Sequence, residues 1–192
     1  MKKTSMVSGI FLTAALLLAR PQTTIVAATA PTCNGVPATR IGTSGNDQII
    51  GTAGVDVIVA LEGNDVINGF GGNDIVCGNQ GRDRIDGGDG NDQIYGGQDS
   101  DEIHGSAGHD HLYGNLGSDT IYGGAGDDAV DGGDGNDTIH GDYCYGSGGA
   151  RICLRGNDTL NGGNGADRIT GGPDFDSCSY GEIYAECERR FP

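Results

Sequence analysis

Residues 87–95 read GGDGNDQIY, and residues 132–140 read GGDGNDTIH, which is nearly the same sequence five nine-residue steps later. Counting in steps of nine from Gly42 gives eleven consecutive units up to residue 140. Residues 141–161 form a twelfth unit with twelve extra residues, and units beginning at 162 and 171 complete a set of fourteen. A fixed period of this kind is the signature of a repeat architecture, in which each unit packs only against its neighbours.

Three positions of the nine-residue unit carry the pattern. Position 6 is Asp in every unit, and position 8 is Ile, Leu or Val in all units but the last, which has Cys178. Position 4 is Gly except at Asp99 and Asp174. The glycine-rich positions 1–6 suit turns that need positive φ, and positions 7–9 suit a short strand with its middle residue pointing inward. We therefore expect a core made of one aliphatic side chain per unit.

The pattern GGxGxDxUx, where U is apolar, resembles the RTX or haemolysin-type calcium-binding repeat from residue 42 to about residue 179. The resemblance implies an all-β fold, a right-handed parallel β-roll (a β-solenoid) with two units per coil. Units eighteen residues apart would then stack as parallel strands. It also implies Ca²⁺ as the cofactor and the position-6 aspartates as its ligands. These candidate metal ligands are Asp47, Asp56, Asp65, Asp74, Asp83, Asp92, Asp101, Asp110, Asp119, Asp128, Asp137, Asp158, Asp167 and Asp176.

The chemistry of the repeat agrees with calcium. Stacked units would place neighbouring carboxylates about one strand spacing apart, roughly 5 Å in the backbone, and they would repel unless cations lay between them. Calcium accepts six to eight oxygen ligands including carbonyls, magnesium needs a tight octahedron, and zinc needs Cys or His clusters. No window supplies the ligand set of an EF-hand. We expect weak sites, with Kd about 10⁻⁴–10⁻³ M, and a chain that calcium folds. The alternative is a metal-free acidic polymer, which the regular aliphatic positions disfavour.

Charge and motifs exclude several classes of function. The 192-residue chain has 27 acidic and 11 basic residues and a net charge of −16. We do not expect such a polyanion to bind nucleic acid or an anionic membrane surface through charge. Neither HExxH nor GxSxG occurs, and only eleven residues lie between Ala30 and Gly42. We therefore expect a protein that is not an enzyme.

The first thirty residues have the pattern of a secretory signal peptide. Met1-Lys2-Lys3 is a basic start, residues 10–19 are an apolar run too short to span a bilayer comfortably, and Ala28-Thr29-Ala30 supplies a cleavage site after Ala30 or Ala28. The alternative is a buried N-terminal helix. We expect a secreted, extracellular protein that has no membrane span and is a monomer.

The rest of the chain divides into a cap at residues 31–41, the roll at 42–179 with an insertion within 141–155, and a second cap at 180–192. Six cysteines in an exported chain imply disulfides. The apolar residues Val57, Val59 and Ile75 should face outward, where the N-terminal segment can cover them. Among fifteen possible pairings, proximity favours Cys33–Cys77, Cys144–Cys153 and Cys178–Cys187.

Aromatic residues should align on the two outer faces of the roll. His104, Tyr122 and His140 share position 9 on one side, and Tyr95 and Tyr113 share it on the other. Cross-strand packing is the simpler interpretation of these columns, and a carbohydrate-binding strip is the sharper one. The sequence thus predicts calcium binding by an exported structural or binding module. The alternative function is a calcium-dependent surface or polysaccharide adhesion module, in which the insertion could also take part.

Overall fold

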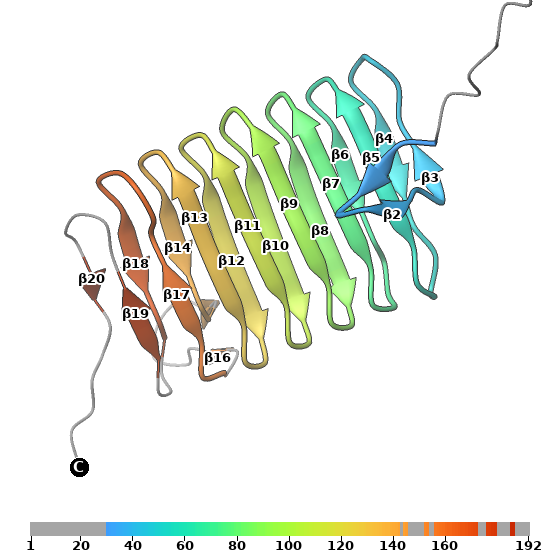
Figure 1. Ribbon diagram of the computed structural model, residues 1–192. Helices are drawn as coiled ribbons and strands as arrows, with labels where there is room; N and C mark the ends of the chain where they lie inside the picture. Colours follow the sequence, from blue (N-terminus) through green and yellow to red (C-terminus); the bar gives the residue numbers. More distant parts are fainter. Residues whose placement is uncertain are drawn as a thin grey trace, which may run out of the picture.

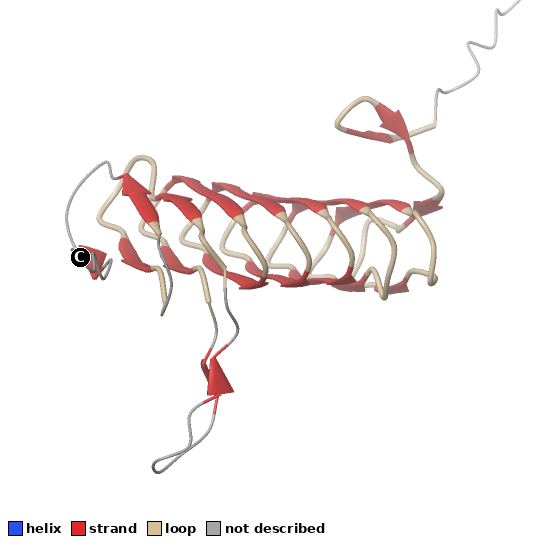
Figure 2. Ribbon diagram, turned by 90° about the horizontal axis from the view of Figure 1, so that it is seen from below, coloured by secondary structure: helices blue, strands red, loops and turns tan. Residues whose placement is uncertain are grey.

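The computed structural model describes residues 30–142, 144–145, 152–153, 156–172, 176–179 and 185–186. Within them the chain winds into a flattened coil with one β-sheet on each broad side (Figures 1 and 2). Each sheet has eight parallel strands, and successive strands along the roll alternate between the two sheets. Glu102 pairs with Thr120, eighteen residues later, so one coil contains two units. The predicted all-β parallel solenoid is confirmed.

The two sheets are called sheet I and sheet II. In order along the roll, sheet I consists of β3 (Arg40–Ile41), β5 (Val57–Glu62), β7 (Ile75–Gln80), β9 (Gln93–Gln98), β11 (His111–Leu116), β13 (Ala129–Asp134), β17 (Thr159–Asn161) and β19 (Ser177–Ser179). Sheet II consists of β4 (Gln48–Ile50), β6 (Val66–Asn68), β8 (Arg84–Asp89), β10 (Glu102–Ala107), β12 (Thr120–Ala125), β14 (Thr138–His140), β18 (Arg168–Thr170) and β20 (Ala185–Glu186).

The central strands are longer than the sequence predicts. Strands β7 to β13 each have six residues and run from position 7 of one unit to position 3 of the next. They continue because the residue at position 2 takes a positive φ without ending the strand, as at Asn79 (φ 79°) and Asn115 (φ 73°). Asparagine and glycine tolerate this conformation, and both recur at position 2. The turns are thereby confined to positions 4–6, which end in the repeated aspartate.

The core is a double file of position-8 side chains between the sheets. Ile103, for example, is fully buried and lies in register with Ile85 and Ile121 on the neighbouring strands. Ile49 and Cys178, both partly buried, pack against the two ends of the file. Position 8 therefore has the inward role that the sequence predicts for it.

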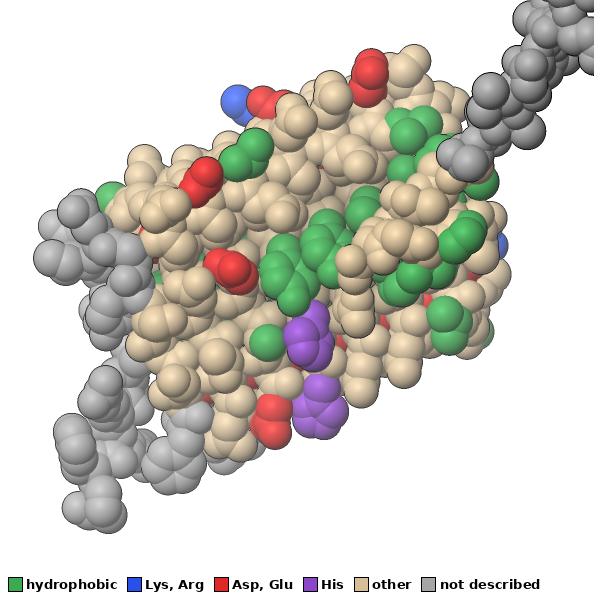
Figure 3. Space-filling view, viewed as in Figure 1, with side chains coloured by type: hydrophobic (Ala, Val, Ile, Leu, Met, Phe, Trp, Pro, Cys, Tyr) green, Lys and Arg blue, Asp and Glu red, His purple; other side chains and the backbone are tan. Residues whose placement is uncertain are grey.

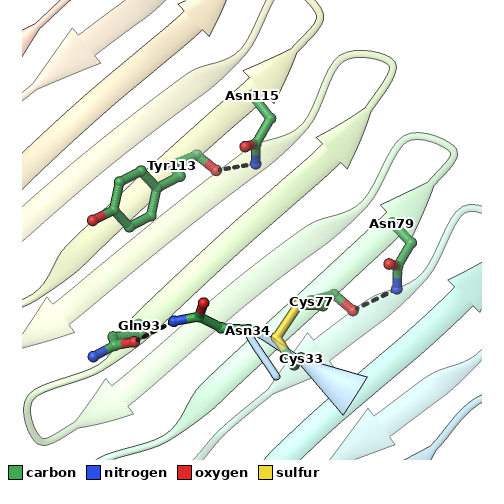
Figure 4. Close-up of a disulfide and its surroundings, with 7 residues drawn as sticks. All are labelled: Cys33, Asn34, Cys77, Asn79, Gln93, Tyr113 and Asn115. Carbon is green, nitrogen blue, oxygen red and sulfur yellow. Dashed lines mark hydrogen bonds between the residues drawn. A yellow bond between two sulfur atoms is a disulfide. The ribbon is translucent and has the colours of Figure 1, made fainter. Parts of the chain in front are cut away.

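The N-terminal segment folds onto the outside of sheet I. Strands β1 (Thr32–Cys33) and β2 (Val36–Pro37) form an antiparallel hairpin around Asn34 and Gly35, both with positive φ, as a tight two-residue turn requires. A disulfide joins Cys33 to Cys77 on β7 (Figure 4). Buried Cys33 packs with Val57 and Val59, which are no more than 5% exposed. The predicted pairing and the predicted cover of this patch are both confirmed.

The remaining cysteines are described in part. In the insertion, β15 (Cys144–Tyr145) and β16 (Ile152–Cys153) pair antiparallel with Cys144 opposite Cys153, and Figure 2 shows this hairpin projecting from the roll. Cys178 is disulfide-bonded, and its predicted partner Cys187 lies outside the described residues. So do the predicted signal peptide, except Ala30, and most of the predicted C-terminal cap. In the part of the chain described here, no helix is long and apolar enough to cross a membrane.

Candidate metal sites in the turns

The position-6 aspartates form two columns, one along each edge of the roll. In each column the backbone N–H of one aspartate donates to Oδ1 of the aspartate in the next coil, at 2.7–3.0 Å. One column contains Asp47, Asp65, Asp83, Asp101, Asp119, Asp137 and Asp167, and the other contains Asp56, Asp74, Asp92, Asp110, Asp128, Asp158 and Asp176. The ladder continues across the insertion, from Asp128 to Asp158 and from Asp137 to Asp167. All fourteen predicted ligands therefore lie in the predicted columns.

The two oxygens of each carboxylate have different environments. Oδ1 caps a backbone N–H, and this structural role was not predicted from the sequence. In ten of the aspartates Oδ2 is buried and has no hydrogen-bond partner among the residues that the structure describes. These are Asp65, Asp74, Asp83, Asp92, Asp101, Asp110, Asp119, Asp128, Asp137 and Asp167. A buried carboxylate oxygen without a partner is strongly unfavourable, so a regular row of them fits a series of cation-binding sites.

Glycine at position 1 keeps the space beside Oδ2 open. A Cβ placed on Gly123 would lie 2.6 Å from Oδ2 of Asp128 and 2.7 Å from the carbonyl oxygen of Gly141 in the next coil. Gly123 does not have a positive φ, so its backbone conformation does not explain why it is glycine. The same near-contacts recur at the position-1 glycines from Gly69 to Gly141, whereas Ala60 takes this position in the unit of Asp65. The missing side chain leaves a space that a carboxylate oxygen and a carbonyl oxygen both face.

Burial raises the pKa of the column carboxyls from Asp65 to Asp137, because the charged form loses its water. The pKa rises to about 8 at Asp101 and Asp128 and to about 7 at Asp83 and Asp92, and carboxylates of the same column contribute to the increase. A fully charged column is therefore unfavourable at neutral pH unless cations balance it.

The first aspartate of each column differs from the others. Oδ2 of Asp47 accepts hydrogen bonds from the backbone N–H and the hydroxyl of Thr43, at 2.6 and 3.0 Å. Thr52 makes the same pair of bonds to Asp56. Burial acts to raise the pKa of Asp56, but the bonds from Thr52 and the nearby charge of Arg40 together lower it. These two aspartates fit a metal least well, because protein donors already satisfy them.

A second hydrogen-bond ladder, which was not predicted from the sequence, lies beside the aspartates at position 5. The side chain of Asn64 accepts the backbone N–H of Arg82, and that of Asn91 accepts the N–H of His109, each from the next coil. His109 in turn accepts the N–H of Asp127 through Nδ1. The signal in the sequence is the recurrence of Asn, Ser, Asp and His at position 5, all of which can accept a hydrogen bond.

The donor set favours calcium over other metals. Among the described residues, no three His, Cys, Asp or Glu side chains converge on one point. A metal between coils must therefore use backbone carbonyls beside no more than two of these side chains, which suits calcium and does not suit zinc.

The comparisons with known proteins agree with this geometry. The chain matches the model of the RTX calcium-binding nonapeptide repeat at residues 41–76, 50–85, 69–103, 78–112, 104–139 and 154–178. The chain belongs to this RTX repeat family. No curated protein matches it. RTX repeats bind calcium, so the residues that would hold the ion here are the position-6 aspartates, through Oδ2, with the carbonyls of position-1 glycines in the neighbouring coil.

The aromatic columns of this RTX roll lie where the sequence places them. The rings of Tyr95 and Tyr113 stack on sheet I with centroids 4.9 Å apart. On sheet II, Tyr122 stacks between His104 and His140, at 4.7 and 5.0 Å. Both columns have the predicted cross-strand packing, and the sheet II column has no convergent set of metal-binding side chains among the described residues.

Proposed function

We propose that this protein is an exported, calcium-loaded β-roll that folds on calcium and serves as an extracellular structural or binding module. The observation that carries the proposal is the row of buried Oδ2 atoms that have no hydrogen bond to any described residue, nine of which lie beside a space that a position-1 glycine leaves open. Calcium supplies the positive charge that balances these carboxylates, so calcium binding and folding are coupled. Export is supported by the basic and apolar pattern of residues 1–30 and by the general secretion of RTX repeat proteins.

The same observations support a role without catalysis. The aspartates of the columns are held as structural caps and calcium ligands, and the chain has no HExxH or GxSxG motif. The acidic charge makes nucleic acid an unfavourable partner. We propose a monomer whose first partner is calcium.

Calorimetric titration of calcium into the chelated chain, followed in parallel by circular dichroism, tests this function. We expect cooperative binding of several ions together with the appearance of β-structure, and no comparable folding with magnesium. A complete β spectrum in chelator, or calcium binding without any spectral change, would contradict coupled folding.

A second candidate function is calcium-dependent adhesion to a surface polysaccharide. The observation that favours it is the stacked tyrosine pair on the outer face of sheet I, which lies beside a groove lined with amide side chains. The insertion hairpin is a further candidate contact, because loops on rigid scaffolds often bind partners.

A further inference from the structure

Part of one outer face of this acidic protein lacks Asp, Glu, Lys and Arg. Strands β7, β9 and β11 read IVCGNQ, QIYGGQ and HLYGNL and contain no Asp, Glu, Lys or Arg. The flanking strands of sheet I are different, since β5 ends in Glu62 and β13 contains Asp131 and Asp134. We call the outward-pointing residues of β7, β9 and β11 the neutral face. Figure 3 looks onto this side of the roll, where hydrophobic side chains gather near the middle among mostly uncharged atoms.

A groove of about 500 Å³ lies on the neutral face. It forms because Gly97 on β9 lies in register between Asn79 on β7 and Asn115 on β11, so a residue without a side chain is flanked by two asparagines. Tyr95 and Gln98 also line the groove. Its volume is within the usual range of small-ligand sites, and its lining combines an aromatic ring with several amides.

The aromatic wall of the groove is held in place from two sides. Tyr95 stacks on Tyr113 with an angle of 5° between the rings. Asn34 of the N-terminal hairpin lies against the Tyr95 hydroxyl and donates to Oε1 of Gln93 at 3.4 Å. The Cys33–Cys77 disulfide fixes that hairpin over β7 (Figure 4). The wall is therefore preorganised by packing and by a covalent bond.

The amides are held by their own strands. Nδ2 of Asn79 donates to the carbonyl of Cys77 at 3.3 Å, and Nδ2 of Asn115 donates to the carbonyl of Tyr113 at 3.2 Å (Figure 4). Each bond leaves the Oδ1 acceptor without a hydrogen bond to any described residue. The exposed Gln98 adds an amide that can both donate and accept. The groove thus offers neutral donors and acceptors at fixed positions.

We propose that this groove binds a neutral polysaccharide. Sugar hydroxyls donate and accept hydrogen bonds as amides do, and the C–H surface of a sugar ring packs on an aromatic side chain such as Tyr95. The neutral face has no Lys or Arg to pair with a carboxylate or phosphate. A basic ligand would instead be attracted to the acidic strands on either side of it. The proposal names the ligand class and the site of the adhesion function above, and it rests on that function and on the calcium-folded roll.

Affinity gel electrophoresis of the calcium-loaded full chain tests the site. The probes are neutral polysaccharides, namely dextran, hydroxyethyl cellulose, galactomannan and arabinoxylan, with carboxymethyl dextran and carboxymethyl cellulose as matched anionic counterparts. We expect at least one neutral polymer to retard the protein. Where that polymer has a carboxymethyl counterpart among the probes, the counterpart should retard the protein less. Tyr95→Ala should weaken that binding about tenfold, and Gln98→Ala about threefold.

Two matched variants on sheet II serve as controls. Tyr122→Ala removes a stacked ring at the same unit position, and Gln48→Ala removes an exposed glutamine, and neither should change binding. Equal losses from Tyr95→Ala and Tyr122→Ala, stronger retardation by the anionic polymers, or no retardation by any neutral polymer would each overturn the proposal. Calcium calorimetry on the same sample separates the two hypotheses, because a roll that binds calcium and folds but binds no polymer refutes only the groove. Gln98→Ala keeps the test valid if Tyr95→Ala fails to fold.

Discussion

The sharpest test of the metal sites is the substitution Gly123→Ala. Because Gly123 does not have a positive φ, alanine is compatible with the backbone there, and the effect of the new methyl group comes from the space that it fills. That methyl would lie 2.6 Å from Oδ2 of Asp128 and 2.7 Å from the carbonyl oxygen of Gly141. Both oxygens must move, and the space between them closes. The variant therefore tests whether that space holds calcium.

Two effects add to give the expected loss. Crowding in a packed interior destabilises by about 1–3 kcal/mol. Loss of one site with a Kd of about 10⁻³–10⁻⁴ M removes about 1.4–2.7 kcal/mol at about 10 mM free calcium. The free energy of unfolding should therefore fall by about 2–6 kcal/mol, and the calcium-dependent part should shrink as free calcium is lowered.

Urea unfolding at fixed free calcium measures this loss, and equilibrium dialysis counts the bound ions. The control is Gly54→Ala, because a Cβ on Gly54 meets nothing within 4 Å and its φ is not positive. That control should stay within about 0.5 kcal/mol of the unmodified protein. The reasoning is refuted if Gly123→Ala loses no more stability than Gly54→Ala, or if it binds the same number of ions.

Three further outcomes follow from the columns. In chelator, lowering the pH from about 8 to about 5 should increase the β-structure seen by circular dichroism. Carboxyls with raised pKa stabilise the metal-free fold at acid pH, and that stability is lost as the pH rises through about 6–8. Calcium-loaded protein should instead lose stability when the pH is lowered in the same way. Asp101→Asn retains an oxygen to cap the N–H of Asp83 but loses the carboxylate charge. It should therefore lower the urea midpoint in calcium and raise the β-content in chelator. A decrease in both would contradict separate roles for the two oxygens. Val55→Asn should place an acceptor at position 5 for the backbone N–H of Asn73 and add about 0.5–1.5 kcal/mol in calcium, whereas Val55→Ala should not.

The fold was predictable because the repeat has an integer period. Units eighteen residues apart stack in register, so residues that share a position in alternate units must share a column, whatever the details of the turn. The period alone correctly places Ile103 in the core file, Asp101 in its column and Tyr113 beside Tyr95. It also placed Cys33 near Cys77, because the apolar patch around β5 and β7 required a cover.

The different roles of the two carboxylate oxygens could not be read from the same period. Sequence assigns Asp92 to a column but does not show that Oδ1 is occupied by the N–H of Asp74, because that depends on side-chain torsions within the turn. The extent of the strands was underestimated for a related reason. Glycines at positions 1 and 2 suggest a turn, yet Gly96 is needed for close approach to Asp101 and lies inside β9. A glycine can be required either for an unusual backbone conformation or for close contact with a neighbouring group. The spacing of glycines in the sequence does not show which of the two applies.

The N-terminal coil differs from the others in how its aspartates are satisfied. A solenoid needs an atypical end, because its first unit has a neighbour on one side only. Here threonine appears at position 2 in the first two units, and Thr43 and Thr52 donate hydrogen bonds to Oδ2 of Asp47 and of Asp56. Asp65 and Asp74, in the next coil, have no such donor among the described residues. Arg40 adds a positive charge beside Asp56. The first coil therefore satisfies its carboxylates with protein groups, and the column of unsatisfied Oδ2 atoms begins in the coil that follows.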